Sequence, residues 1–185
     1  MPETQTATEV ESRFLDPEKL VERLAISPGM AVADFGSGSG FFSIPLGRAV
    51  GKQGKVFAID VVPQASEAVS SRSRLEGLLQ IETIRADLEQ PDGSKLSGES
   101  IDLVLVANIL FQAKKKDAVL EEANRILKQG GRLIMVEWRP DSPFGPEKTA
   151  RVSPEEAKRL AGGSGFRLQE EFAGGPHHYV LVFEK

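Results

Sequence analysis

The chain has 185 residues, enough for one domain with a sizeable core, and its 40% hydrophobic and 27% charged residues are typical of a soluble globular protein. Its net charge of -4 indicates no broad basic surface, so nucleic acid is not an expected partner. The chain contains no cysteine, which excludes disulfides, thiolate metal sites and cysteine nucleophiles, and its two histidines are too few for a histidine-rich metal site.

Residues 1–12 are polar, rich in Thr and Glu, and unlike a secretory signal. We expect this segment to be flexible and to order, if at all, over a binding site. No apolar run along the chain reaches the roughly 18 residues that a membrane helix needs. These features predict a cytoplasmic protein without a membrane span.

The pattern of apolar residues predicts strands that alternate with helices. A first helix begins after Asp16 as N-cap, and a capping box of Ser153 and Glu156 begins the last short helix. The predicted strands span residues 31–35, 55–60, 81–86, 101–107, 132–138, 166–172 and 178–183. The remaining helices span residues 42–50, 63–77 with Leu75 on the buried side, and about 119–127, the last closed by Gly130 and Gly131.

This order indicates an α/β fold. Alternating strands and helices imply a parallel sheet with right-handed crossovers, and the hairpin formed by the last two strands adds an antiparallel strand. The sequence shows no internal repeat and no linker, so we predict a single domain over residues 1–185.

A glycine-rich turn follows the first strand. Gly36, Gly38 and Gly40 stand at alternate positions, where they let the backbone turn tightly and approach a ligand. The helix that follows would direct unpaired N–H groups toward that ligand. A strand, a glycine loop and a helix in this order predict a nucleotide site, and a tight turn without a ligand is the alternative.

Two interpretations of the loop compete. The dinucleotide fingerprint G-x-G-x-x-G/A, typical of an NAD-dependent oxidoreductase, would place its third small residue at Phe41. The run from Asp34 to Gly40 reads instead D-x-G-x-G-x-G. This run resembles motif I of the class I methyltransferases that use S-adenosylmethionine.

The resemblance extends from about residue 16 to the end of the chain. Residues 28–34 and 127–133 resemble the small-molecule, ubiquinone/menaquinone-type group of this family. The resemblance implies a Rossmann-like three-layer α/β/α sandwich whose seven-stranded, mostly parallel sheet has the order 3-2-1-4-5-7-6 and an antiparallel last strand. It also implies S-adenosyl-L-methionine as cofactor, S-adenosyl-L-homocysteine as product and a small-molecule methyl acceptor.

Two acids at strand ends match the family's nucleoside contacts. The resemblance implies that Asp60, followed by Val61, accepts hydrogen bonds from the ribose hydroxyls. Asp87 would accept from the adenine amino group, and Leu88 would offer its backbone N–H and its side chain to the ring. The alternatives are an exposed acid at a strand end for Asp60 and a turn or cap residue for Asp87.

Other residues match the amino-acid end of the cofactor. Gly36 and Gly38 would let the backbone pass beside it. Asp34 would either help to hold the ammonium group or hold the loop through backbone N–H groups. Asn108, at the end of the fourth predicted strand, would lie beside the sulfonium.

The acceptor side is less defined by sequence. An activated methyl donor needs positioning and exclusion of water, and a general base only where the acceptor must lose a proton. His177 and His178 are weak candidates for that role, and a polar hairpin turn is the simpler interpretation. The absence of proline after Asn108 argues against base amino groups, and the absence of cysteine against cytosine C5 or arsenic as acceptor.

Other functions and assemblies stay open at this point. A catalytically silent nucleotide-binding module of the same fold is one alternative, and an NAD-dependent oxidoreductase is a second. A homodimer is also compatible with the sequence.

Overall fold

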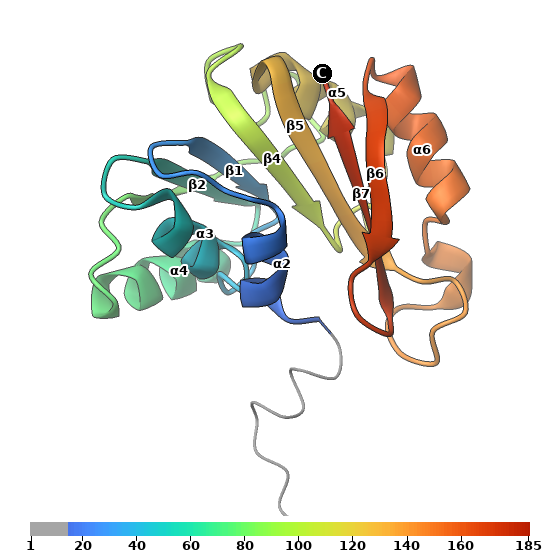
Figure 1. Cartoon of the computed structure of the whole chain (residues 1–185), viewed down its shortest axis with the longest axis horizontal. Helices are drawn as coiled ribbons and strands as arrows, with labels where there is room; N and C mark the ends of the chain where they lie inside the picture. The colour runs from blue at the N-terminus through green and yellow to red at the C-terminus, as the bar shows by residue number, and fades with distance from the viewer. Residues whose placement is uncertain (1–14) are drawn as a thin grey trace, which may run out of the picture.

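The computed structural model describes residues 15–185, which form a seven-stranded sheet in the order β3-β2-β1-β4-β5-β7-β6 (Figure 1). Neighbouring strands from β3 to β5 are parallel, whereas β7 runs antiparallel to both β5 and β6. The expected sheet order and antiparallel last strand are therefore confirmed. The strands are β1 (Ala31–Phe35), β2 (Lys55–Asp60), β3 (Ile81–Arg85), β4 (Ile101–Ala107), β5 (Leu127–Trp138), β6 (Arg167–Ala173) and β7 (His178–Glu184).

Helices cover both faces of the sheet, as expected for a three-layer sandwich. Residues of α2 and α3 join one apolar cluster with one face, and residues of α5 and α6 join another cluster with the opposite face. The helices are α2 (Pro17–Arg23), α3 (Ser43–Val50), α4 (Pro63–Leu75), α5 (Lys116–Ile126) and α6 (Pro154–Gly163), with a short 3-10 turn at Lys148–Ala150. No helix within residues 15–185 combines the length and apolarity needed to cross a membrane.

Local sequence signals explain where helices begin. The Asp16 side chain accepts from the backbone N–H of Lys19 at 3.2 Å, and Ser153 accepts from that of Glu156 at 3.1 Å. Both residues are thus the N-caps that the sequence predicts.

In the centre of the sheet, β4 is covered on both sides, which accounts for its continuous apolar run.

Two details of the sequence interpretation are wrong. Gly130 and Gly131 do not close α5, because the helix ends at Ile126 and the fully buried Leu127 already pairs with Ile101 of β4. The glycines lie instead within the irregular start of β5. Leu75 is not on a buried side, since it ends α4 and is 87% exposed.

The parallel strands all end at one edge of the sheet. This edge carries the glycine loop after β1 and the residues that follow β2, β3 and β4. In open α/β sheets ligands bind beyond the carboxyl ends of the strands, so this edge is where a site is expected.

Candidate functional site

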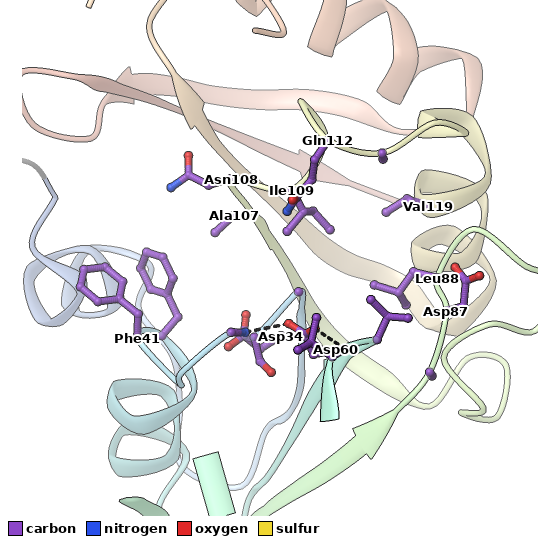
Figure 2. Close-up of a pocket in the computed structure, with 18 of the residues that line it drawn as sticks. Asp34, Phe41, Asp60, Asp87, Leu88, Ala107, Asn108, Ile109, Gln112 and Val119 are labelled. Atoms are coloured by element: carbon purple, nitrogen blue, oxygen red, sulfur yellow. Dashed lines mark hydrogen bonds between the residues drawn. The ribbon is translucent and has the colours of Figure 1, made fainter. Parts of the chain in front are cut away.

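A cavity of about 620 Å³ opens at this edge, between the loops that follow β1, β2, β3 and β4. Figure 2 shows Asp34 and Asp60 on one side of it, Asn108, Ile109 and Gln112 opposite, and Asp87 and Leu88 on a third side. The cavity brings together nearly all site residues expected from the sequence, namely Asp34, Gly36, Gly38, Asp60, Val61, Asp87, Leu88 and Asn108. Gly40 is the exception, since it does not line the cavity; a Cβ atom there would lie 3.1 Å from Cγ2 of Val69 in α4.

The glycine loop has the left-handed backbone that its sequence predicts. Gly36 and Gly38 have φ angles of +72° and +51°. A Cβ atom at Gly36 would lie 2.2 Å from Cγ2 of Ile109, whereas one at Gly38 would meet no atom within 4 Å. The absence of a side chain at Gly36 therefore makes room for the Ile109 side chain, whereas the space beside Gly38 is unoccupied by protein atoms.

Asp60 links two of the loops around the cavity. One carboxylate oxygen accepts from the backbone N–H of Gly38 and the other from that of Val62, each at 2.9 Å. A carboxylate has about four acceptor sites, so these two bonds leave others for a ligand. Asp60 is thus both a support of the glycine loop and a possible acceptor within the cavity.

The side chain of Asp34, near the end of β1, bonds to the start of α3. Asp34 is only 2% exposed, and its carboxyl group accepts from the Ser43 hydroxyl at 2.5 Å. Burial raises the pKa of Asp34 to about 6, the Ser43 bond lowers it, and the Asp60 charge raises it. This bond places a buried carboxyl group beside the first residue of the helix that follows the glycine loop.

Asp87 forms a turn at the cavity rim. Its two oxygens accept from the Glu89 N–H at 3.0 Å and from the Gln90 side chain at 3.1 Å. The turn interpretation of Asp87 therefore fits the structure, and its position on the cavity wall also leaves it available to a ligand. The neighbouring Leu88 is buried and forms part of the same wall.

Two buried oxygen atoms in the cavity wall have no hydrogen-bond partner within residues 15–185. They are Oδ1 of Asn108 and Oγ of Ser37. Asn108 also has a φ of +55°, an uncommon conformation for a residue other than glycine. Since buried polar atoms are normally paired, the two oxygens indicate a polar ligand at this place.

All charged residues that line the cavity are acidic. Four carboxyl groups face it, from Asp34, Asp60, Asp87 and Glu89, and its described lining contains no Lys, Arg or His. Such a lining favours a ligand with positive charge and disfavours a diphosphate. This charge distribution separates the two interpretations of the glycine loop better than its spacing does.

The sequence interpretation missed residues that build the opposite wall. Ile109 and Gln112 line the cavity from the loop after β4. The loop is bonded to Glu137 of β5, which is 1% exposed and accepts from the Leu110 N–H at 2.9 Å. Burial raises the pKa of Glu137 to about 8. The sequence feature that could have indicated Glu137 is its position as the single acid after the apolar residues of β5.

His177 and His178 lie outside the lining of this cavity. The buried His178 ring packs beside Trp138, with 4.2 Å between ring centroids, and both rings stand at paired positions of β5 and β7. His177 contacts Phe144 edge to face and its Nδ1 lies 3.2 Å from the Ser142 hydroxyl. These histidines belong to an aromatic cluster at the end of β5.

The sheet order, the glycine loop and the acidic cavity define a Rossmann-like protein of the methyltransferase class. The sequence profile of the family described as "Methyltransferase domain" matches residues 26–170. The chain belongs to this family.

Curated relatives match about two thirds of the chain. The ubiquinone/menaquinone biosynthesis C-methyltransferase UbiE of Laribacter hongkongensis is 35% identical over 127 residues, which cover 64% of this chain and 48% of the relative. The arsenite methyltransferase of Halobacterium salinarum is 28% identical over 120 residues, or 65% of this chain and 30% of that protein. The matches thus span half or less of the length of these relatives.

Solved structures share the fold over nearly the whole chain. A S-adenosylmethionine-dependent methyltransferase from Aquifex aeolicus superimposes with a TM-score of 0.86, 24% identity and coverage of 94% of this chain and 91% of the other. The [4+2]-cyclase SpnF superimposes with a TM-score of 0.76 at 15% identity, covering 91% and 80%. The fold is therefore shared by a protein described as a methyltransferase and by one described as a cyclase.

Proposed function

We propose that this protein transfers a methyl group from S-adenosylmethionine to a small-molecule acceptor. The observation that carries the proposal is the lining of the cavity, in which four carboxyl groups occur without a basic residue. The cofactor has a sulfonium and an ammonium group, whose positive charges such a lining stabilises. The open space at Gly38 and the unpaired oxygens of Ser37 and Asn108 add room and polar contacts for it.

The chain's residues divide the binding task by position. In this proposal Asp60 accepts from the ribose hydroxyls with the acceptor sites that Gly38 and Val62 leave free. Asp87 and Leu88 contact the adenine ring, and Asn108 offers its unpaired Oδ1 to the methionine end. Asp34 acts mainly by holding the start of α3, because Ser43 already bonds to its carboxyl group.

The bound cofactor supplies a methyl group on a cationic sulfur that is ready for in-line displacement. The protein then has to orient the acceptor and exclude water, which lowers the barrier without covalent chemistry by the chain. The glycine loop, fixed by Asp60 and Ile109, gives the rigid surface that such orientation requires. No step in this account depends on His177 or His178.

A small apolar or aromatic acceptor is the proposed substrate class. Phe41 lines the cavity and is 37% exposed, and the aromatic cluster with Trp138 stands at the same edge of the sheet. The name of the UbiE relatives, which refers to quinone biosynthesis, agrees with such an acceptor. The arsenite methyltransferase relative does not extend to this chain in our proposal, because the chain has no cysteine.

The test combines a thermal shift with a transfer assay. A ligand that binds only the native state raises the melting temperature, so S-adenosylmethionine at millimolar concentration is expected to stabilise the protein. Methyl-labelled cofactor and a panel of quinols, phenols and amines then report transfer. A thermal shift without transfer to any acceptor would favour the catalytically silent module, and no shift at all would contradict the proposal.

A further inference from the structure

We propose that Glu137 is a positioning residue for the cofactor cavity. From β5, its side chain holds the loop after β4 in contact with the glycine loop. The inference rests on the proposed function, since it assigns a support to the same site. Glu137 is not among the residues that line the cavity, so it acts through the loop and not on a ligand.

The first observation is the bond between Glu137 and the loop. Glu137 is 1% exposed on β5, and Oε1 accepts from the backbone N–H of Leu110 at 2.9 Å. The N–H of Ile109 also stabilises the charged form of this carboxyl group. One buried side chain therefore satisfies the Leu110 N–H, which would otherwise be buried without a partner.

The second observation is the contact that this loop makes. The Ile109 side chain fills the space beside Gly36, where a Cβ atom would lie 2.2 Å from its Cγ2. The next turn of the loop is closed by bonds from the N–H groups of Gln112 and Ala113 to the Ile109 carbonyl, both at 3.1 Å. A continuous set of contacts thus runs from Glu137 through Ile109 to the glycine loop.

The third observation is the absence of another described role for Glu137. Within residues 15–185 it forms no ion pair, and Lys116 of α5 is the cation whose charge acts on it. Tyr179 of β7 is paired with Glu137 in the sheet, but the Tyr179 hydroxyl donates to the Val152 carbonyl at 2.8 Å. A buried carboxyl group without partners is costly, and the bond to the Leu110 N–H offsets part of this cost.

The raised pKa of Glu137, about 8, agrees with this arrangement. With this pKa the group is mostly protonated at neutral pH, and its Oε1 still accepts from the Leu110 N–H. A glutamine at this position keeps a neutral acceptor oxygen of similar size. A methionine keeps the volume and removes the acceptor.

The test compares Glu137→Gln with Glu137→Met in two measurements. Hydrogen exchange at the amides of residues 109 and 110 reports the hold on the loop, and calorimetry with S-adenosylhomocysteine reports the cavity. We expect Glu137→Gln to match the wild type closely in both. Glu137→Met is expected to exchange faster at these amides and to bind the product about tenfold or more weakly, a difference of one decade in Kd.

The control variant is Asp102→Ala. Asp102 accepts from the backbone N–H of Ala31 at 2.8 Å, which is the same kind of bond at the opposite edge of the sheet. This variant should bind the product like the wild type. As a second route to the same contact, Ile109→Ala should weaken binding, and adding it to Glu137→Met should cost little more, because both act on one set of contacts.

Three outcomes would overturn the inference. Slow exchange at residues 109 and 110 in folded Glu137→Met would show that the carboxyl group does not hold the loop. Faster exchange with unchanged binding would show that the hold does not matter for the cavity, and a Gln variant as impaired as Met would exclude the acceptor oxygen as the cause. If the wild type binds no product, the proposed function fails by itself, and the exchange data still decide whether Glu137 holds the loop.

Discussion

The carboxylate of Asp60 accepts a hydrogen bond from the backbone N–H of Gly38 at 2.9 Å, joining the end of β2 to the glycine loop after β1. This bond fixes the loop before any ligand arrives, which reduces the ordering cost of binding. The same carboxylate remains on the cavity surface. Asp60 therefore has two roles: it holds the glycine loop in place, and in our proposal it also contacts the cofactor.

The first prediction concerns this residue. Asp60→Ala is expected to weaken S-adenosylhomocysteine binding by about 1–3 kcal/mol, because ribose hydroxyls and the Gly38 N–H lose a charged acceptor. Asp102→Ala is the control, since Asp102 lies at the amino end of β4 and pairs with Lys128. Calorimetry that ranks Asp102→Ala as the more damaging change would contradict the placement of the site.

The second prediction separates two glycines of one loop. Gly36→Ala meets both a positive φ and the Ile109 side chain, so it should lower the melting temperature and weaken product binding. Gly38→Ala also has a positive φ but no neighbour within 4 Å, so it should destabilise the protein less. Thermal melts with and without product check this order, and equal losses of stability would refute it.

The third prediction concerns stability against pH. Glu137 has its pKa raised from 4.5 to about 8 in the folded state, so the folded protein holds a proton that the unfolded chain has released. Stability should then fall as pH rises between these values, by up to about 1.4 kcal/mol per pH unit from this group. Asp34, raised from 3.8 to about 6, adds a fall in the same direction at lower pH.

Glu137→Gln removes the titrating group of this prediction. Urea unfolding of the variant should show a smaller loss of stability between pH 6 and pH 8 than the wild type shows. Parallel pH profiles for the two proteins would mean that Glu137 does not titrate in this range.

The fourth prediction concerns the loop beyond β5. The Arg151 guanidinium donates to the backbone carbonyls of Arg139, Pro140, Ser142, Phe144 and Pro146, and Gly145 of this loop lies against the Trp138 ring. Arg151→Gln should loosen the loop and expose Trp138, the only tryptophan of the chain. Tryptophan fluorescence is expected to become more sensitive to a soluble quencher.

The control for this change is Arg167→Gln, which removes an exposed ion pair with Glu184. It should leave the fluorescence unchanged, and both variants should bind the product like the wild type. A loss of product binding in Arg151→Gln would mean that this loop contributes to the cofactor cavity.

The sequence predicts the acidic side of the site well. Asp60 ends β2 and Asp87 follows β3, and parallel strands bring their carboxyl ends to one edge, so these residues meet there. The same reasoning places Asn108 correctly on the cavity wall. The strand order predicts where these residues lie, whereas their expected roles in binding come from the family resemblance.

The opposite wall could not be predicted in this way. The loop that brings Ile109 beside Gly36 begins with a positive φ at Asn108, a conformation that asparagine tolerates but does not require. Glu137 bonds to this loop from a strand whose sequence gives no indication of the loop's path. The end of α5 was also predicted too late, at Gly130 and Gly131. The pairing of Leu127 with Ile101, a contact distant in sequence, ends the helix earlier.

The most direct test of the account is a calorimetric titration of the wild-type protein with S-adenosylhomocysteine and, separately, with NAD. The acidic cavity and the bond between Asp34 and the start of α3 predict saturable binding of S-adenosylhomocysteine and no measurable binding of NAD. Binding of NAD without binding of S-adenosylhomocysteine would contradict the central claim that this cavity is built for a cationic methyl donor and its product.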